Sequence, residues 1–322
     1  MQQFIDKQEQ STEDGPAANA LSNSQAPDGI YSDSKCGDNL QVAGADLSTE
    51  DARGKELFSS FKERVCGACF DMIAIHKGTF RMGNNASYED EKPAHPETVD
   101  DFYLSKTEVV ISQFNVFIAD THYQTDAERN GNSYIWTDHG WEKKKGVSWR
   151  CDGTGNIRKS TDPDFPVVHV SWNDAMAFCQ WLSDKTRKVY RLPSEPEWEY
   201  SAGGGTCSRT TWSGTDDESK LNNYAWFRMN SDRSIHPVGE KLPNALGLYD
   251  MSGNVWEWCR EWYGCYDQDE PEDPAGPSAH YDRASRGGSW LYDPYHCRVS
   301  FRHFATPDFS DGAQGFRLAL DV

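Results

Sequence analysis

The spacing of hydrophobic and polar residues after about position 70 predicts a series of short strands. Strands are indicated by runs that alternate apolar and polar residues, or by short apolar runs that end at turn residues. The clearest alternation places Cys297, Val299 and Phe301 on one side of the chain and the polar residues between them on the other. The predicted strands cover residues 70–75, 78–83, 99–103, 297–302 and 315–320.

Apolar residues at helical spacing predict a few helices between these strands. One helix begins at Ser112, and a second begins at Asn173 or Asp174, either of which can cap it. Ser194 and Glu197 form a capping box with a proline in the first turn, so a third helix is expected there. The apolar sides of the first two helices hold Phe114, Phe117 and Ile118, and Ala175, Phe178, Cys179 and Leu182.

The remaining chain is dominated by irregular segments. Residues 121–164 are rich in Gly, Asp and Lys and predict a long loop anchored by Trp136, Trp141 and Trp149. Few helices, short strands and much irregular structure together indicate an α+β fold.

The first 50 residues lack any such periodicity. They carry nine acidic residues and two lysines, and their apolar residues are isolated, which predicts an acidic flexible tether. Residues 51–69 are expected to form a short helix and a connector, with the helix spanning 48–64 and burying Leu57, Phe58 and Phe61. The folded domain is then expected to cover residues 70–322.

Composition and charge narrow the function classes. The chain of 322 residues has a formal net charge of −19, which argues against nucleic-acid binding and against docking on anionic lipid. Hydrophobic residues make up 37%, yet aromatics reach 13% with twelve Trp, so a folded core is present. No segment has the roughly 20 consecutive apolar residues of a membrane helix.

An acidic tether before a compact domain is common in surface lipoproteins, although ordinary linkers share it. No secretory signal is visible at the first residues. Either the protein is cytoplasmic or a leader has been removed. The tether favours the second alternative, an exported protein at the cell surface or outer membrane that is held only through an N-terminal lipid anchor.

Cysteine usage is ambiguous because the count of nine is odd. Cys66 and Cys69 form a CxxC, but neither a second CxxC nor paired histidines accompany it, so a zinc site is not indicated. The pair predicts either one local disulfide or two thiols. Cys179 lies on a predicted apolar helix side and is expected to be a small buried residue.

Six phrases in one order resemble the formylglycine-generating-enzyme family. They are GTFRMG (78–83), PVVHVSW (166–172), RLPSE (191–195), GLYDMSGNVWEW (247–258), RGGSW (286–290) and GFRL (315–318). The resemblance covers about residues 70–320 and implies the family's C-type-lectin-like fold. A shared fold does not by itself settle function.

The resemblance also implies where catalysis would reside. Enzymes of the family oxidise a substrate cysteine with copper held by two cysteines, whose positions correspond here to Tyr292 and Cys297. Trp256 and Ser289 match the surroundings of that site. Two thiolates suit Cu(I), whereas a phenol is a hard ligand. We therefore expect no catalytic residues and no organic cofactor, and we expect Cys297 in the core.

A structural calcium site is the one cofactor that the resemblance suggests. Its ligands correspond to the side chains of Asp250 and Glu257 and the carbonyl groups of Gly253 and Val255. Oxygen donors of this kind suit Ca²⁺. The alternative is that the two acidic residues only cap turns.

The stretch 291–313 has an unusual composition. Sixteen of its positions hold residues that are reachable from an asparagine codon by changing its adenines, and none of these is Lys, Glu, Gln, Met or Trp. This pattern resembles the variable proteins that retroelements diversify, which include treponemal surface proteins. The predicted ligand-binding face consists of Trp290, Leu291, Tyr292, Asp293, Tyr295, His296, Phe301, His303, Phe304, Ala305, Thr306, Asp308, Phe309, Ser310 and Asp311.

These observations favour a non-enzymatic ligand-binding display protein whose C-terminal face is diversified by a retroelement. Aromatic side chains mixed with small hydrogen-bonding ones are typical of binding surfaces. The expected partner is an unknown protein or other surface ligand, bound by a monomer. Two alternatives remain, a copper-dependent cysteine oxidase and a lectin-like interaction module of fixed specificity.

Overall fold

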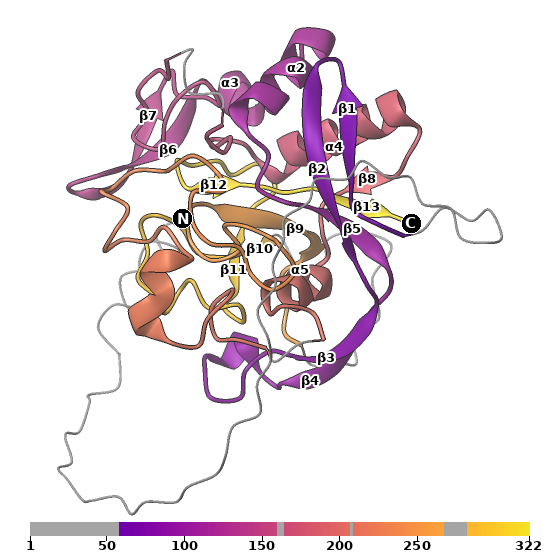
Figure 1. Cartoon of the computed structure of the whole chain (residues 1–322). Helices are drawn as coiled ribbons and strands as arrows, with labels where there is room; N and C mark the ends of the chain where they lie inside the picture. The colour runs from indigo at the N-terminus through magenta and orange to yellow at the C-terminus, as the bar shows by residue number, and fades with distance from the viewer. Residues whose placement is uncertain (1–57, 160–163, 207–208, 267–281) are drawn as a thin grey trace, which may run out of the picture. The chain divides into compact units, whose positions relative to one another are not determined.

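The computed structural model describes residues 58–159, 164–206, 209–266 and 282–322 (Figure 1). The chain divides into two units, residues 1–50 and 51–322. The first unit, with the predicted tether, lies outside the described residues. None of the helices that the structure describes has the length and apolar character needed to cross a membrane.

Strands outnumber helices in the described part of the second unit. The helices are α2 Ile111–Thr121, α3 Asp126–Asn130, α4 Trp172–Thr186 and α5 Glu195–Ala202, with 3-10 turns η1 Glu89–Glu91 and η2 Glu218–Asn223. The strands are β1 Phe61–Val65, β2 Ala68–Ile75, β3 Gly78–Met82, β4 His95–Val99, β5 Phe102–Ser105, β6 Asn132–Thr137, β7 Gly140–Lys145, β8 Tyr190–Arg191, β9 Trp256–Trp262, β10 Arg283–Arg286, β11 His303–Ala305, β12 Gln314–Gly315 and β13 Ala319–Asp321.

These strands form two sheets and two separate hairpins. The larger sheet has the order β1-β2-β5-β13-β8 and the smaller has the order β11-β10-β9-β12. Strands β3 and β4 pair separately, as do β6 and β7, and these hairpins lie at opposite ends in Figure 1. Strand β12 runs parallel to β9, whereas the other pairs within the sheets are antiparallel.

The buried helix sides match the sequence pattern. Phe114 of α2 stacks on Phe178 of α4 with ring centroids 5.8 Å apart, and Phe178 also contacts Phe70 of β2. The predicted capping box of α5 is confirmed, since Ser194 Oγ accepts the Glu197 N–H at 3.2 Å. The cap of α4 is Ser171 rather than Asn173 or Asp174, and Asp174 completes its capping box.

The predicted helix over 48–64 is wrong where the structure describes it. Residues 61–65 form strand β1, which pairs with β2 through a two-residue turn at Cys66 and Gly67. Both turn residues have positive φ, 49° and 89°, as a tight hairpin requires. Cys66 and Cys69 are free thiols, as are all the cysteines assigned within the described residues.

Tertiary contacts also change three other predicted segments. Residues 121–164 contain α3 and the β6–β7 hairpin rather than only a loop, and Trp136 opposes Trp141 across that hairpin. Residues 99–103 split at Asp100 and Asp101, so that β4 and β5 enter different sheets. Residues 315–320 likewise divide between β12 and β13, which also belong to different sheets.

The predicted strand 297–302 is a series of turns that leads into β11. The Cys297 N–H donates to the Pro294 carbonyl, and the Phe301 N–H donates to the Arg298 carbonyl. All six side chains are buried, including both arginines. The alternation of apolar and polar residues is therefore real, but its polar side faces buried carboxylates instead of water.

Candidate functional site

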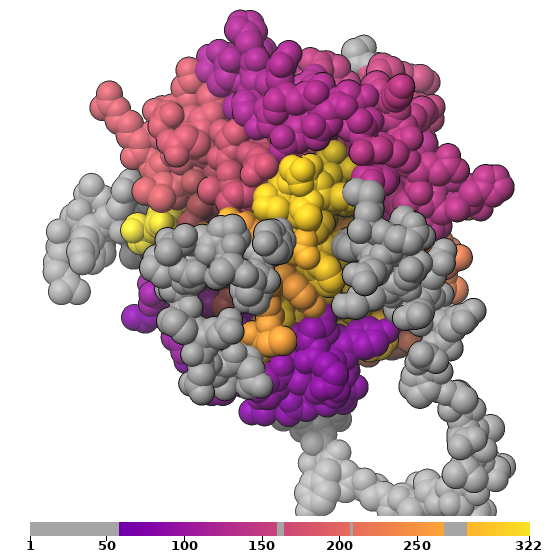
Figure 2. Space-filling model, turned by 180° about the vertical axis from the view of Figure 1, so that it is seen from behind, coloured from indigo at the N-terminus to yellow at the C-terminus, as the bar shows by residue number. Residues whose placement is uncertain are grey.

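The C-terminal segment 290–313 lies between parts of the chain that are distant in sequence. Figure 2 shows the C-terminal chain, in yellow, reaching the surface between magenta and violet segments. The segment consists of turns, strand β11 and a loop that returns to β12. Tyr295, Thr306 and Asp308 are exposed. The half-buried members of the predicted face are Leu291, Tyr292, Asp293, His303, Phe304 and Phe309.

Six members of the predicted face are buried and are corrected to supporting residues. Trp290 is only 1% exposed, and its Nε1–H donates to the Gly312 carbonyl at 3.1 Å. Asp311 accepts the Ala313 N–H at 2.8 Å, and burial raises the pKa of Asp311 to about 7. Sequence alone did not distinguish them because their side-chain types also occur on surfaces. The buried members are Trp290, His296, Phe301, Ala305, Ser310 and Asp311.

An aromatic layer supports the exposed residues from below. Trp256, itself buried, stacks on His303 with centroids 4.7 Å apart and meets Tyr292 edge-on at 5.3 Å. His303 Nδ1 bonds with Ser285 Oγ at 3.0 Å. Burial lowers the pKa of His303 to about 3, so this imidazole is neutral near pH 7.

Two flanking elements that the sequence did not associate with the site complete its edges. Tyr88, just before η1, packs edge-on against Tyr295 with centroids 5.2 Å apart. Tyr134 of β6 stacks on Phe309 at 5.4 Å. No spacing rule connects residues more than 150 positions apart, so only the fold brings these side chains together.

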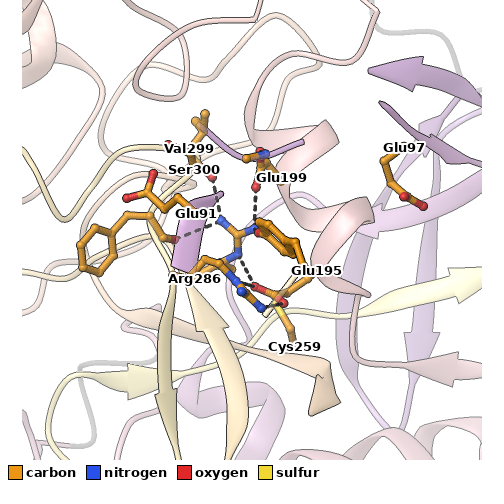
Figure 3. A network of polar contacts seen from close by, with 12 residues as sticks. Glu91, Glu97, Glu195, Glu199, Cys259, Arg286, Val299 and Ser300 are labelled. Carbon is orange, nitrogen blue, oxygen red and sulfur yellow. Dashed lines mark hydrogen bonds and ion pairs between the residues drawn. The ribbon is translucent and has the colours of Figure 1, made fainter. Parts of the chain in front are cut away.

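Buried arginines fix the scaffold beneath the segment. Arg298 donates to both Glu91 oxygens at 2.8 and 3.1 Å, and Arg302 donates to both Glu195 oxygens at 2.9 and 2.7 Å. Figure 3 shows the Arg286 guanidinium between Glu195 and a second carboxylate of α5. Burial alone would raise the pKa of Glu195, but Arg302 and Arg286 lower it to about 2.

The predicted copper positions do not form a two-thiolate site. Tyr292 occupies one position, and Cys297 is 0% exposed at the other. The Cys297 side chain belongs to a core cluster with Trp212 and Phe227, and burial raises the pKa of its thiol well above its usual value. One thiol beside a phenol does not supply the two thiolates that suit Cu(I). The residues present therefore do not fit a bound copper ion.

The predicted calcium ligands fit only in part. Both Glu257 oxygens accept N–H bonds from Arg317, at 2.6 and 2.7 Å, so this carboxylate is already neutralised. Asp250 Oδ2 accepts the Gly239 N–H at 2.7 Å, whereas its buried Oδ1 has no hydrogen-bond partner among the described residues. Among all the residues that the structure describes, no cluster of three or more His, Cys, Asp or Glu side chains is suited to a metal ion.

A further buried carboxylate lies beside Asp250. Glu108 Oε1 accepts from Asn254 Nδ2 at 3.1 Å, but Glu108 Oε2 has no hydrogen-bond partner in the described structure. Burial and the neighbouring carboxylates raise the pKa of Glu108, which lies close enough to Asp250 for the two to interact. Asp250 Oδ1 and Glu108 Oε2 are therefore suited either to binding a cation or to sharing a proton. Glu108 is a candidate cation ligand that no sequence signal identified.

Comparisons with known proteins agree with this fold. The family model described as sulfatase-modifying factor enzyme 1-like domain matches residues 57–322. The formylglycine-generating enzyme of Bos taurus is 34% identical over 284 residues, covering 78% of this chain and 74% of its own. The inactive C-alpha-formylglycine-generating enzyme 2 of Mus musculus is 32% identical over 281 residues, covering 77% and 85%.

A solved structure extends the comparison to a variable protein. Treponema denticola variable protein 1 is 28% identical, with a TM-score of 0.62 over 81% of this chain and 98% of its own. These neighbours confirm the predicted α+β fold of the C-type-lectin-like type. They include enzymes and a protein named inactive, so the choice between them depends on the site.

Proposed function

The chain belongs to the family of sulfatase-modifying factor enzyme 1-like domains, and from this premise we propose that it is a non-enzymatic ligand-binding display protein. The observation that carries the proposal is the pair of residues, Tyr292 and Cys297, at the two positions that correspond to the family's copper-binding cysteines. Tyr292 stands where a second thiol would be needed, and Cys297 is sealed in the core. Oxidase chemistry that needs two thiolates on one copper ion lacks its ligands here.

The composition of the exposed and half-buried residues of the C-terminal segment supports binding. Large rigid side chains are provided by Tyr292, Tyr295 and Phe309. Side chains that form hydrogen bonds are provided by Asp293 and Thr306. This mixture gives contact area at a low cost in conformational entropy.

The buried arginines support the idea that this surface is diversified by a retroelement. Arg298 and Arg302 are anchored on Glu91 and Glu195, so neighbouring exposed positions change without altering the support. Exposed substitutions away from such anchors change stability little. Sequencing the flanking DNA tests this part. A near-copy of codons 286–320 that differs at adenines, beside a reverse-transcriptase gene, is expected; its absence would favour fixed specificity.

An oxidation assay tests the non-enzymatic part. The full chain is incubated with copper, oxygen and a cysteine-containing peptide, and peptide aldehyde is followed by mass spectrometry. We expect no catalytic turnover by the wild type or by Cys297→Ser. Copper-dependent turnover that Cys297→Ser abolishes would favour the oxidase alternative, which the 34% identity to the bovine enzyme keeps relevant.

A structural cation is a secondary proposal. Asp250 Oδ1 and Glu108 Oε2 are buried and have no hydrogen-bond partner among the described residues, which supports Ca²⁺ at this position. The Gly253 and Val255 carbonyls would be further ligands. Glu257 would join only by releasing a bond to Arg317. We further propose a surface location through an N-terminal lipid anchor, supported by the acidic composition of residues 1–50. We also propose a monomeric state.

A further inference from the structure

Two exposed tyrosines from distant parts of the chain form an aromatic ledge at one edge of the C-terminal segment. Tyr88 and Tyr295 are each 39% exposed, and their rings meet at 87° with centroids 5.2 Å apart. Ser87 Oγ lies 3.0 Å from the Tyr295 hydroxyl oxygen, which ties the two chain segments together. We call Tyr88 and Tyr295 the tyrosine ledge.

Buried contacts hold the tyrosine ledge in place. The Arg298 guanidinium lies beneath the Tyr295 ring, 3.9 Å from its centroid, and pairs with the buried Glu91. Glu91 also accepts a hydrogen bond from Ser87 Oγ at 2.5 Å. Because these contacts already order both tyrosines, a ligand that binds them loses little further side-chain entropy.

The charges around the tyrosine ledge favour a cationic ligand group. The buried cation Arg298 is neutralised by Glu91, whereas the Asp293 side chain is 46% exposed. Asp293 Oδ1 is held by His296 Nδ1 at 2.7 Å and by the Tyr295 N–H at 3.1 Å. The pKa of Tyr88 is raised, mainly by burial and to a smaller extent by the neighbouring Tyr295 and Asp293, so its phenol stays neutral near pH 7. The tyrosine ledge thus offers aromatic rings next to the carboxylate of Asp293.

We propose that the tyrosine ledge docks an arginine or lysine side chain of a polypeptide ligand, and that Tyr88 contacts this ligand although it lies outside the C-terminal segment. Cations bind favourably over tyrosine rings, and Arg does so most often. The net charge of −19 attracts basic segments over longer range. The inference rests on the proposed ligand-binding function and adds a ligand class for this chain and a contact at Tyr88, outside the C-terminal segment.

Peptide selection tests the proposal without a known ligand. A phage-displayed library of random linear 12-residue peptides is selected on the full chain, and biolayer interferometry measures the affinities of the enriched peptides. We expect enrichment of Arg and Lys, and roughly tenfold weaker binding to Tyr88→Ala and Tyr295→Ala. Tyr88→Phe retains the ring and should bind within about twofold of the wild type.

The control is Met229→Ala, because Met229 is 79% exposed and lies outside the C-terminal segment. Thermal melting checks that every variant is folded. Peptides that lose affinity with Tyr295→Ala but not with Tyr88→Ala would overturn the ledge while leaving the proposed function standing. Peptides insensitive to Tyr295→Ala and Phe309→Ala would count against both. A selection without basic residues, or with no enriched peptide, overturns the ledge proposal.

Discussion

Replacing Glu91 with Gln should destabilise the folded domain, because the Arg298 guanidinium would stay buried without its counter-charge. Glu91 is 0% exposed and Arg298 is 7% exposed, and two N–H bonds at 2.8 and 3.1 Å join them. Removing one partner of a buried ion pair costs about 3–5 kcal/mol. Gln keeps the volume and one acceptor oxygen, so we expect a loss near the lower limit, about 3 kcal/mol.

Urea unfolding followed by tryptophan fluorescence measures this loss as a lower midpoint at an unchanged slope. In thermal melting the same loss corresponds to roughly 6–12 °C, at about 2–4 °C per kcal/mol for a domain of this size. The matched control is Asp138→Asn, which breaks a 2.8 Å pair with Arg233 at the surface. That exposed pair should change the midpoint very little.

The double variant Glu91→Leu/Arg298→Met replaces both members of the pair with apolar residues. Removing both charges should recover most of the lost stability, because an apolar replacement of a buried pair is often neutral. The reasoning is refuted if Glu91→Gln costs no more than Asp138→Asn, or if the double variant is as unstable as the two single losses added together.

Three further predictions follow from other buried groups. The pKa of Glu195 is lowered to about 2, so this carboxylate contributes stability that is present above its unfolded pKa of about 4.5 and is lost as the pH falls toward 2. Glu195→Gln should flatten the curve of unfolding free energy against pH between about 4.5 and 2. A curve unchanged by the substitution would contradict this. Calcium should raise the melting temperature of the wild type but not of Asp250→Asn, and an equal response of both would exclude Asp250 as a ligand. Gly253→Ala should cost several times more than Gly131→Ala in urea unfolding. Both glycines have positive φ, but only at Gly253 would a Cβ lie 2.1 Å from the Trp226 carbonyl oxygen, so equal costs would refute the steric argument.

Local signals predicted α2, α4 and α5, because the formation of these helices depends on nearby residues, although they failed at 48–64 and missed α3. The α5 capping box uses Ser194 and Glu197, which are three positions apart, and both bonds form as expected. Phe114 and Phe178 were predicted to be buried from helical spacing alone, and both are 0% exposed. Such features involve one turn of chain and need no knowledge of the rest of the fold.

Predictions failed where residues distant in sequence determine whether a side chain is buried. The alternation at 297–302 predicted a strand with Arg298 and Arg302 on its polar side, but this segment forms turns. Glu91 and Glu195 accept the charges of the two arginines inside the domain. Burial of an arginine is favourable only with such a partner, and a partner more than 100 positions away is invisible to periodicity. Trp290 was assigned to the exposed face for a similar reason, since its Gly312 acceptor is supplied by the returning chain.

By itself the sequence determined the family resemblance, the α+β class, the acidic charge and the missing second thiol at Tyr292, because each depends on residue identity or short spacing. The tertiary structure alone decided which residues of the C-terminal segment reach the surface. It also placed Tyr88 beside Tyr295, and it left one carboxylate oxygen each of Asp250 and Glu108 without a hydrogen-bond partner in the described part of the chain. These outcomes arise from side chains that meet only after folding, when burial and partner charges set the energy of each group.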